Sequence, residues 1–203
     1  MTLTLERVET LRREFPALAR QQQGQPAAFF DGPAGTQVPR RVMDAISHYL
    51  SNCNANHGGL FPTSIESDAL LDQVHAAAAD FLGADDPETV FFGANMTSLT
   101  FAMSRALART WKPGDEVIVT RLDHDANVRP WTLAARDAGA VVKFAPIRRE
   151  DCTLDLDALK SLISPKTRLV AIGAASNSVG SINPVREVAD AAHAVGALCF
   201  VDA

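Results

Sequence analysis

The sequence has few cysteines and no cysteine motif. Cys53, Cys152 and Cys199 lie far apart along the chain, and no CxxC pair occurs. This spacing excludes a disulfide framework and a zinc ribbon. We therefore expect a reducing, cytoplasmic setting for the protein.

Positive charge is also scarce. The sequence has 19 Lys and Arg against 24 Asp and Glu, which gives a net charge of −5. Binding along a nucleic-acid backbone needs clustered Lys and Arg. We therefore expect no nucleic-acid partner.

No hydrophobic run is long enough to cross a bilayer, which takes about 20 apolar residues. The longest nearly apolar stretch covers residues 194–201, and residues 1–15 alternate charged and apolar side chains instead of forming the apolar core of a signal peptide. The five histidines show no HxH or HExxH spacing. We expect neither membrane association nor a metal site.

What the sequence does contain is enough apolar material for a core, with 203 residues of which 47% are hydrophobic. From residue 90 onward, short apolar runs alternate with helical segments, an order typical of βα units and a parallel sheet. The predicted strands are 90–92, 116–120, 140–144, 168–173 and 197–201. The predicted helices between them are 97–109, 126–137, 155–162 and 185–195.

The part before residue 90 is predicted to be mainly helical. Apolar residues at helical spacing, together with proline and glycine at the ends of the runs, predict three helices. These helices cover residues 1–15, 38–50 and 67–82, with a short strand at 28–30 and a loop at 52–63.

Polar residues gather after the predicted strands, where ligands of open α/β sheets bind. Residues 93–98 form a glycine turn that opens a helix, and its N–H groups either bind a phosphate or are simply capped. His124 lies between Asp123 and Asp125. This histidine is a metal ligand, a general acid or base, or part of a capping cluster.

Two further strand ends carry an amide and an acid. Asn177 lies in the polar segment after residues 168–173, and Asp202 directly follows residues 197–201. A carboxylate at such a place is costly to bury without a cationic or hydrogen-bonding partner. Together the four strand ends describe a cofactor with a phosphate, an aromatic ring and a protonated ring nitrogen.

Two other enzyme classes lack their motifs in this sequence. No GxGxxG or GxxxxGK[ST] follows a predicted strand, as nucleotide binding would require. His57-Gly58-Gly59 is similar to the oxyanion loop of an α/β-hydrolase, but no GxSxG occurs. A non-catalytic protein on the same fold stays open.

From about Phe29 to its last residue, the chain resembles the class V aminotransferase-fold, pyridoxal-phosphate-dependent enzymes. Within them it is most similar to the cysteine desulfurase-like group, which includes selenocysteine lyases. The motifs that carry the resemblance are FDGPAGT at 30–36, FGANMT at 92–97, LDHDANVRPW at 122–131, SNSVGSINPV at 176–185 and VDA at 201–203.

The resemblance implies a role for each candidate residue. Asp202 would pair with the pyridinium nitrogen of pyridoxal 5'-phosphate, and Asn177 would donate to the phenolic oxygen of the ring. His124 would stack on the ring and move protons. The turn formed by Ala94, Asn95 and Met96 would hold the phosphate.

Some family features are replaced or absent. Ala94 and Asn95 stand where the family has paired threonines, and Asp125 stands where desulfurases often have a second histidine. The sequence has four lysines, Lys112, Lys143, Lys160 and Lys166, and none follows a predicted strand at the active edge. In the family the lysine that forms the Schiff base comes after the strand that ends at Asp202. Cys199 lies inside a predicted strand, where a core role is expected.

We therefore expect an α/β fold, the large domain of an aspartate aminotransferase-like transferase, with a mostly parallel sheet flanked by helices and its C-terminal part missing. Residues 1–27 are interpreted as an N-terminal helical segment and 28–203 as an incomplete cofactor-binding domain. The expected function is the N-terminal half of a cysteine desulfurase-like lyase that acts on a small amino acid. The alternatives are a class V aminotransferase or epimerase acting on another amino acid, or a non-catalytic scaffold. The resemblance also implies a homodimer.

Overall fold

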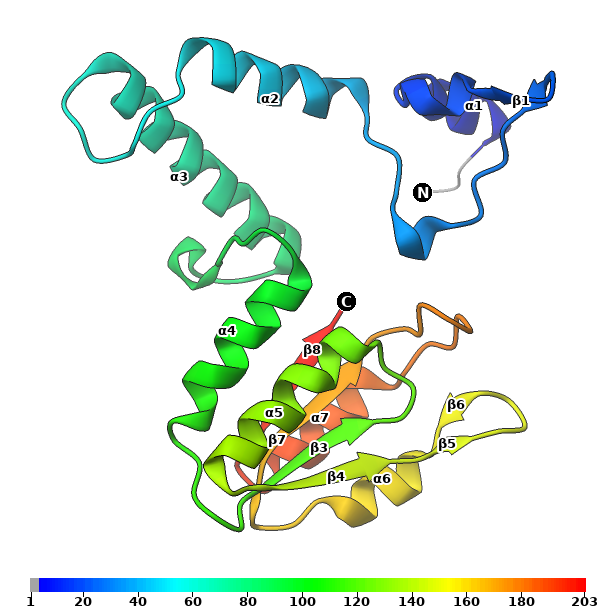
Figure 1. The fold of residues 1–203 in the computed structure, drawn as a ribbon, viewed down its shortest axis with the longest axis vertical. Helices are drawn as coiled ribbons and strands as arrows, with labels where there is room; N and C mark the ends of the chain where they lie inside the picture. The colour runs from blue at the N-terminus through cyan, green and yellow to red at the C-terminus, as the bar shows by residue number, and fades with distance from the viewer. Residues whose placement is uncertain (1–3) are drawn as a thin grey trace. The chain divides into compact units, whose positions relative to one another are not determined.

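The structure is a computed structural model that describes residues 4–203. The chain forms two compact units, one up to Phe91 and the other Phe92–Ala203 (Figure 1). Each unit is described by itself. The sequence-based boundary at residue 27 stays a prediction.

The first unit is mainly helical, as predicted. Its helices are α1 (Leu5–Arg13), α2 (Arg40–Asn52) and α3 (Pro62–Leu82), with 3-10 turns η1 (Pro16–Ala19), η2 (Gly32–Ala34) and η3 (Pro87–Thr89) and a hairpin of β1 (Gln21–Gln22) and β2 (Gln25–Pro26). The helices predicted at 38–50 and 67–82 are confirmed, although α3 begins five residues early. The helix predicted at 1–15 is confirmed over Leu5–Arg13, and residues 1–3 of that prediction lie outside the described residues. Pro62 provides a favourable first helical residue, and Gly83 ends α3 in the left-handed region, with φ of 68°.

The loop between α2 and α3 is held by side chains of α3. Ser64 Oγ accepts from the Gly59 N–H at 2.7 Å, and Asp68 accepts from the Gly58 N–H at 3.0 Å. Ser67 Oγ donates to the Cys53 carbonyl at 3.0 Å. The glycine N–H groups of residues 58–59 are therefore engaged inside the unit, which removes the support for an oxyanion loop.

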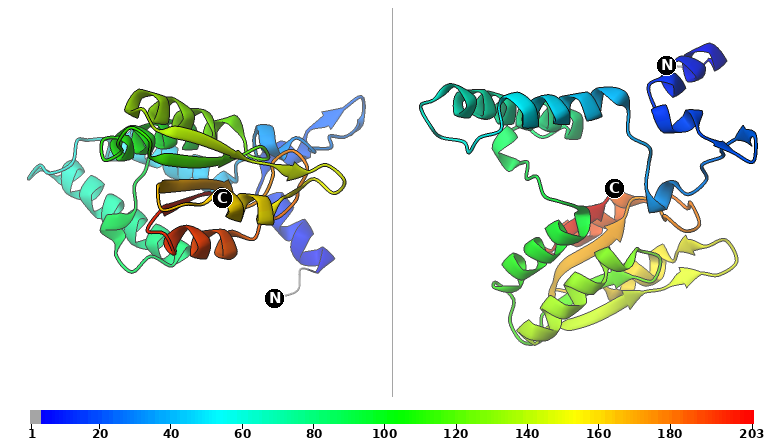
Figure 2. Two further views of the ribbon diagram at one scale, coloured as in Figure 1. Left: turned by 90° about the horizontal axis from the view of Figure 1, so that it is seen from below. Right: turned by 45° about the horizontal axis from the view of Figure 1, so that its top comes forward.

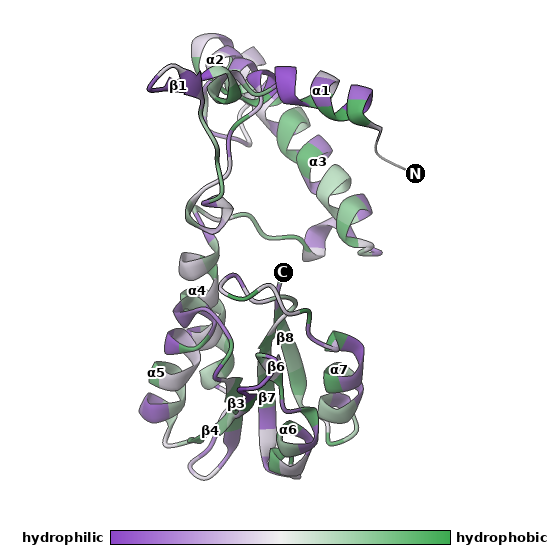
Figure 3. Cartoon of the chain, turned by 90° about the vertical axis from the view of Figure 1, so that its right-hand side faces the viewer, coloured by the Kyte–Doolittle hydropathy of each residue, from purple (hydrophilic) through white to green (hydrophobic). Residues whose placement is uncertain are grey.

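The second unit is a three-layer α/β/α arrangement around a parallel sheet (Figures 2 and 3). Its strands are β3 (Glu116–Thr120), β4 (Val141–Ala145), β7 (Thr167–Gly173) and β8 (Leu198–Asp202), in the order β4-β3-β7-β8. Its helices are α4 (Met96–Ala108), α5 (Arg129–Ala138), α6 (Leu156–Leu162) and α7 (Val185–His193). A 3-10 turn, η4 (Asp125–Asn127), precedes α5, and a hairpin of β5 (Ile147–Arg148) and β6 (Thr153–Leu154) precedes α6.

The two central strands, β3 and β7, are almost wholly buried, and their successive residues point to opposite faces of the sheet. Val117 and Val119 of β3 pack with Trp131 of α5 on one face. Ile118 packs with Leu159 of α6 on the other. Figure 3 shows α4 and α5 on one side of the sheet and α6 and α7 on the other. The predicted mostly parallel sheet flanked by helices is thus confirmed.

Four predicted strands are confirmed to within one residue, but two others are wrong. Residues 28–30 and 90–92 form no strand. A strand is stable only where a neighbour completes its ladder of hydrogen bonds, and neither run pairs with one. Phe30 is 94% and Phe91 73% exposed, so these apolar runs do not enter a sheet core.

The strand order creates a switch point between β3 and β7. From β3 the chain passes through α5 to β4, which lies on one side of β3, and β7 lies on its other side. In such sheets a crevice opens between the carboxyl ends of the two central strands, and ligands bind there.

Over residues 4–203, no helix has the length and apolar character needed to span a membrane.

Candidate functional site

Asp123 connects the carboxyl ends of the two central strands. The hydroxyl of Thr120, the last residue of β3, accepts from the N–H groups of Leu122 and Asp123 at 3.1 and 3.2 Å, which turns the chain sharply. The turn directs the Asp123 carboxylate across to β7, where Oδ1 accepts from the Gly173 N–H at 2.6 Å. Sequence reasoning gave Asp123 no role beyond flanking His124.

The environment of Asp123 disfavours its charge. Burial raises the pKa of the Asp123 carboxyl, and the nearby carboxylate of Asp202 raises it further, although the hydrogen bonds from Gly173 and Thr120 act in the opposite direction. Its Oδ2 atom is buried without a hydrogen-bond partner among the described residues. Two carboxyl groups, those of Asp123 and Asp202, therefore lie near each other at this edge of the sheet.

Gly173 joins this edge to the last strand. It is paired in register with Asp202 of β8, and the carbonyl of Asp202 accepts from the Ala174 N–H at 2.6 Å. The Gly173 carbonyl accepts from Asn183 Nδ2 at 2.8 Å. The predicted Asp202 is therefore placed beside β7, as the final residue of β8 and not just after it.

His124 lies one residue beyond Asp123 and is exposed. Its Nδ1 accepts from the Ala126 N–H at 3.1 Å and caps the turn η4. The neutral ring therefore carries its proton on Nε2. The capping interpretation is confirmed in this structure, and it leaves Nε2 available for another role.

Asn177 lies in the loop that follows β7. The loop is closed by hydrogen bonds from Ser176 N–H to the Ser181 carbonyl at 2.9 Å and from Gly180 N–H to the Ser176 carbonyl at 3.0 Å. The buried hydroxyl of Ser176 accepts from the N–H groups of Ser178 and Val179, both at 3.3 Å. Asn177 itself is exposed at the tip of this ordered loop.

The turn formed by Ala94, Asn95 and Met96 opens helix α4. Asn95 is its N-cap, and Asn95 Oδ1 accepts from the Ser98 N–H at 2.9 Å. Helix geometry leaves the N–H groups of Met96 and Thr97 without a partner inside the helix. Figures 1 and 3 show this end of α4 at the same end of the unit as the carboxyl ends of the strands.

A buried layer lies beneath these polar residues. Asn127 Oδ1 accepts from the indole N–H of Trp131 at 3.1 Å, and both side chains are fully buried. Trp131 packs edge-on against Phe200 of β8, with ring centroids 4.8 Å apart. The sequence indicates Trp131 only as part of a motif, because its contact with Phe200 joins α5 to β8, which are distant along the chain.

None of the four lysines lies at the carboxyl edge of the sheet. Lys143 is paired with Glu116 at 2.7 Å at the opposite end, and Lys160 is paired with Glu187 at 3.1 Å on the helical surface. Cys199 is half-buried against the core, and burial raises the pKa of its thiol. A core role for Cys199 agrees with its prediction.

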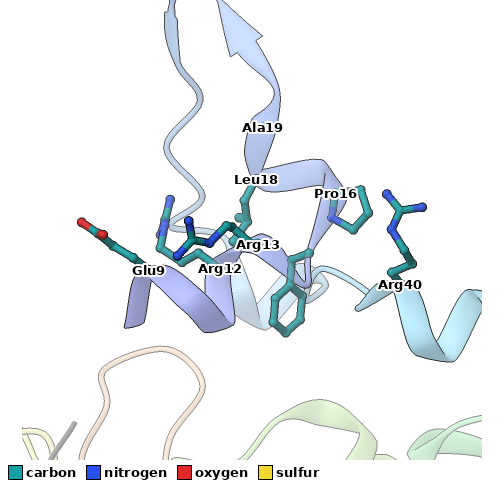
Figure 4. Close-up of a pocket in the computed structure, with 8 residues that line it drawn as sticks. Glu9, Arg12, Arg13, Pro16, Leu18, Ala19 and Arg40 are labelled. Carbon is teal, nitrogen blue, oxygen red and sulfur yellow. The ribbon is translucent and has the colours of Figure 1, made fainter. Parts of the chain in front are cut away.

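A separate hollow of about 620 Å³ lies in the first unit, lined by Glu9, Arg12, Arg13, Phe15, Pro16, Leu18, Ala19 and Arg40 (Figure 4). Arg12 and Arg13 stand in the last turn of α1, where positive charge offsets the helix dipole. No candidate cofactor residue lines this hollow.

Over residues 4–203, no group of three or more His, Cys, Asp or Glu is placed to hold a metal ion.

The sequence and the fold both match known proteins. Residues 28–203 match the family model described as aminotransferase class-V. A probable cysteine desulfurase from Synechocystis sp. is 35% identical over 200 residues, which are 96% of this chain and 46% of that protein. A probable cysteine desulfurase from Halobacterium salinarum is 37% identical over 202 residues, covering 96% of this chain and 48% of its own length.

Solved structures agree. The apo cysteine desulfurase of Thermococcus onnurineus NA1 matches with a TM-score of 0.86 at 26% identity, over 96% of this chain and 47% of that one. A cysteine desulfurase from Escherichia coli matches with a TM-score of 0.77 at 26% identity, over 95% and 47% of the two chains. The chain spans about half the length of the relatives it matches.

Proposed function

Because the chain belongs to the aminotransferase class-V family, we propose that it forms the cofactor bed of a pyridoxal-phosphate-dependent lyase that removes sulfur from cysteine. The resemblance stated from the motifs is confirmed, and enzymes of this family and the cysteine desulfurases depend on pyridoxal phosphate. One observation carries the proposal: His124, Asn177 and Asp202 lie at or just beyond the carboxyl ends of β3, β7 and β8. Figure 3 shows the N-terminus of α4 at the same end of this sheet.

The residues present fit the cofactor. Asp202 stands near the carboxyl group of Asp123, whose buried Oδ2 atom has no hydrogen-bond partner within residues 4–203, and a protonated ring nitrogen would place a positive charge beside Asp202. The free N–H groups at the start of α4, a helix of 13 residues, suit the phosphate. The hydroxyls of Thr97 and Ser98 supply donors that the family takes from its paired threonines.

Each residue then has a defined task. Pyridoxal phosphate supplies an electron-accepting ring when bound. Asp202 would hold the proton on the ring nitrogen, and the Asn177 amide would donate to the phenolic oxygen. His124 would stack on the ring and hold or move a proton at Nε2, a task suited to imidazole near neutral pH.

Cysteine is proposed as substrate because the relatives are named cysteine desulfurases. The substitutions at Ala94, Asn95 and Asp125 make an aminotransferase or epimerase acting on another amino acid the second candidate. A lysine for the Schiff base would come from a part of the enzyme that the resemblance places after Asp202.

The test is a product assay on the full-length protein that carries this chain. With L-cysteine, pyridoxal phosphate and a thiol reductant, we expect alanine and sulfide in equal amounts. His124→Ala should lower the rate at least about 100-fold, because general acid–base catalysis contributes that much. Parallel assays supply other amino acids with and without a 2-oxo acid as amino-group acceptor. A keto acid that forms only with the acceptor would indicate an aminotransferase, a racemised amino acid an epimerase, and no product a scaffold, and each result would contradict the lyase proposal.

We further propose a cytoplasmic homodimer. All three cysteines are free, which is consistent with a reducing compartment. Helix α2 leaves Val42, Met43, Ile46 and Leu50 exposed, an apolar surface consistent with association. Light scattering of the full-length protein would report a single-chain mass if the dimer were wrong.

A further inference from the structure

The sheet opens between its two central strands. The register of β3 on β4 runs to Thr120↔Ala145, and that of β7 on β8 runs to Gly173↔Asp202. The register of β3 on β7, by contrast, ends at Ile118↔Val170. The carboxyl ends of β3 and β7 therefore extend past their shared ladder, at the place where the candidate site lies.

The Asp123 carboxylate bridges this opening. Its Oδ1 accepts from the Gly173 N–H at 2.6 Å, across 50 residues of sequence. The fit leaves no room for a side chain at residue 173, because a Cβ added there would lie 2.6 Å from Asp123 Oδ1. The identity of Gly173 is thus tied to the presence of Asp123.

The bridge also lies between the candidate residues. His124 is the next residue after Asp123, and Asp202 is the register partner of Gly173. The Gly173 carbonyl is held by Asn183 at 2.8 Å, which anchors the end of the loop that carries Asn177. One carboxylate therefore connects the supports of His124, Asn177 and Asp202.

We infer that Asp123 is a positioning residue: by accepting from the Gly173 N–H it clamps the ends of β3 and β7 and so aligns His124 with Asp202 for a single ligand. This inference rests on the proposed function for the identity of the ligand. Asp123 touches neither substrate nor cofactor in this role. It acts through the backbone of its neighbours.

The same two strands provide a matched control at their other end. Asp115, just before β3, accepts from the Lys112 N–H at 2.8 Å and pairs with Arg168 of β7 at 3.0 Å. Like Asp123, it joins the β3 and β7 segments through a carboxylate. Asp115→Ala should therefore cost stability without disturbing the carboxyl edge.

The experiment measures the affinity of the cofactor-free full-length protein for pyridoxal phosphate by quenching of tryptophan fluorescence. We expect Asp123→Ala to weaken binding at least about tenfold, equal to about 1.4 kcal/mol, because it leaves the Gly173 N–H unpaired. Asp123→Asn keeps an oxygen acceptor of the same shape and should bind within about threefold of wild type. Asp115→Ala should bind as wild type does, although it unfolds more easily.

A double variant and hydrogen exchange test the clamp directly. Gly173→Ala alone should weaken binding as Asp123→Ala does, and combining both substitutions should add little, because removal of the carboxylate makes room for the new Cβ. The Gly173 amide proton should exchange faster in Asp123→Ala than in Asp115→Ala.

Two results would overturn the clamp while leaving the proposed function intact. One is wild-type protein that binds pyridoxal phosphate with Asp123→Ala no weaker than Asp115→Ala. The other is Asp123→Asn as weak as Asp123→Ala, which would show that charge matters and the hydrogen bond does not. Wild-type protein that fails to bind pyridoxal phosphate at all would overturn the proposed function, and the clamp as a cofactor-positioning device with it.

Discussion

The pKa values of two carboxyl groups, one at each end of the sheet, are shifted in opposite directions. At the amino end, Glu116 accepts from Lys143 at 2.7 Å and Ser164 at 2.6 Å, and these hydrogen bonds lower the pKa of Glu116. At the carboxyl end, burial raises the pKa of Asp123. The ionised form is thus stabilised for Glu116 at the amino end of the sheet. It is disfavoured for Asp123 at the carboxyl end, where a ligand is proposed.

The lowered pKa of Glu116 predicts an acid-sensitive contribution to stability. An acid whose pKa is lower in the folded than in the unfolded protein stabilises the fold above its ordinary value of 4.5, and this contribution is lost as pH falls through the lowered pKa. Glu116→Gln should therefore cost about 1–2 kcal/mol at pH 7 and almost nothing well below the lowered pKa. Urea unfolding midpoints measured from pH 7 downward check this, and an equal cost at every pH would contradict it.

The raised pKa of Asp123 predicts the opposite pH dependence of stability. An acid whose pKa is raised in the folded state favours folding below its ordinary value of 3.8, and that contribution is lost as pH rises through the raised pKa. The charged form of Asp123 therefore opposes folding through its burial. A buried environment that disfavours the charge of an acid is more typical of a functional site than of a stabilising contact.

At the scale of single elements, helix α4 combines two functions at one end. Asn95 satisfies the Ser98 N–H at 2.9 Å, and the N–H groups of Met96 and Thr97 stay available for an anion. Asn95, one of the two residues that stand where the family has paired threonines, therefore serves as the cap of this helix. Capping and phosphate binding are thus compatible interpretations of the same turn.

Two substitutions separate these functions. Asn95→Ala removes the cap and should lower the free energy of unfolding by about 1 kcal/mol. Asn95→Asp keeps the cap and adds a charge that favours the helix dipole, so stability should be restored. The same charge repels a phosphate and should weaken pyridoxal phosphate binding about tenfold or more. Urea unfolding and fluorescence titration measure the two effects, and unweakened binding by Asn95→Asp would exclude this turn as the phosphate site.

At the scale of the whole second unit, the sheet contributes residues to two hydrophobic cores, one on each of its faces. Leu159 is fully buried on the α6 and α7 face. Both tryptophans of the chain, Trp111 and Trp131, pack on the α4 and α5 face. Because alternate residues of the same strands form both cores, the two faces should unfold together.

A core substitution on one face tests this cooperativity. Leu159→Ala should destabilise the unit by about 2–5 kcal/mol and shift the urea midpoint reported by tryptophan fluorescence, although both tryptophans lie on the other face. Leu198→Ala, at a side chain that is 52% exposed on β8, is the control and should shift it less. An unchanged fluorescence midpoint in Leu159→Ala would show that the faces unfold independently.

Much of this protein is determined by its sequence alone. Glu116–Thr120 was predicted without error and three other strands to within one residue, because a buried parallel strand needs a continuous apolar run. The helices and the candidate residues His124, Asn177 and Asp202 followed from local patterns and motifs. Short-range spacing carries this information because it sets which face of an element is apolar.

The tertiary structure decided what depends on distant partners. Residues 28–30 and 90–92 are apolar like the true strands, and only the absence of a neighbouring ladder keeps them out of the sheet. The bond from Gly173 to Asp123 joins residues 50 positions apart. No periodicity encodes such a contact, because it exists only once β3 and β7 lie side by side in the parallel sheet that brings the separate motifs to one edge.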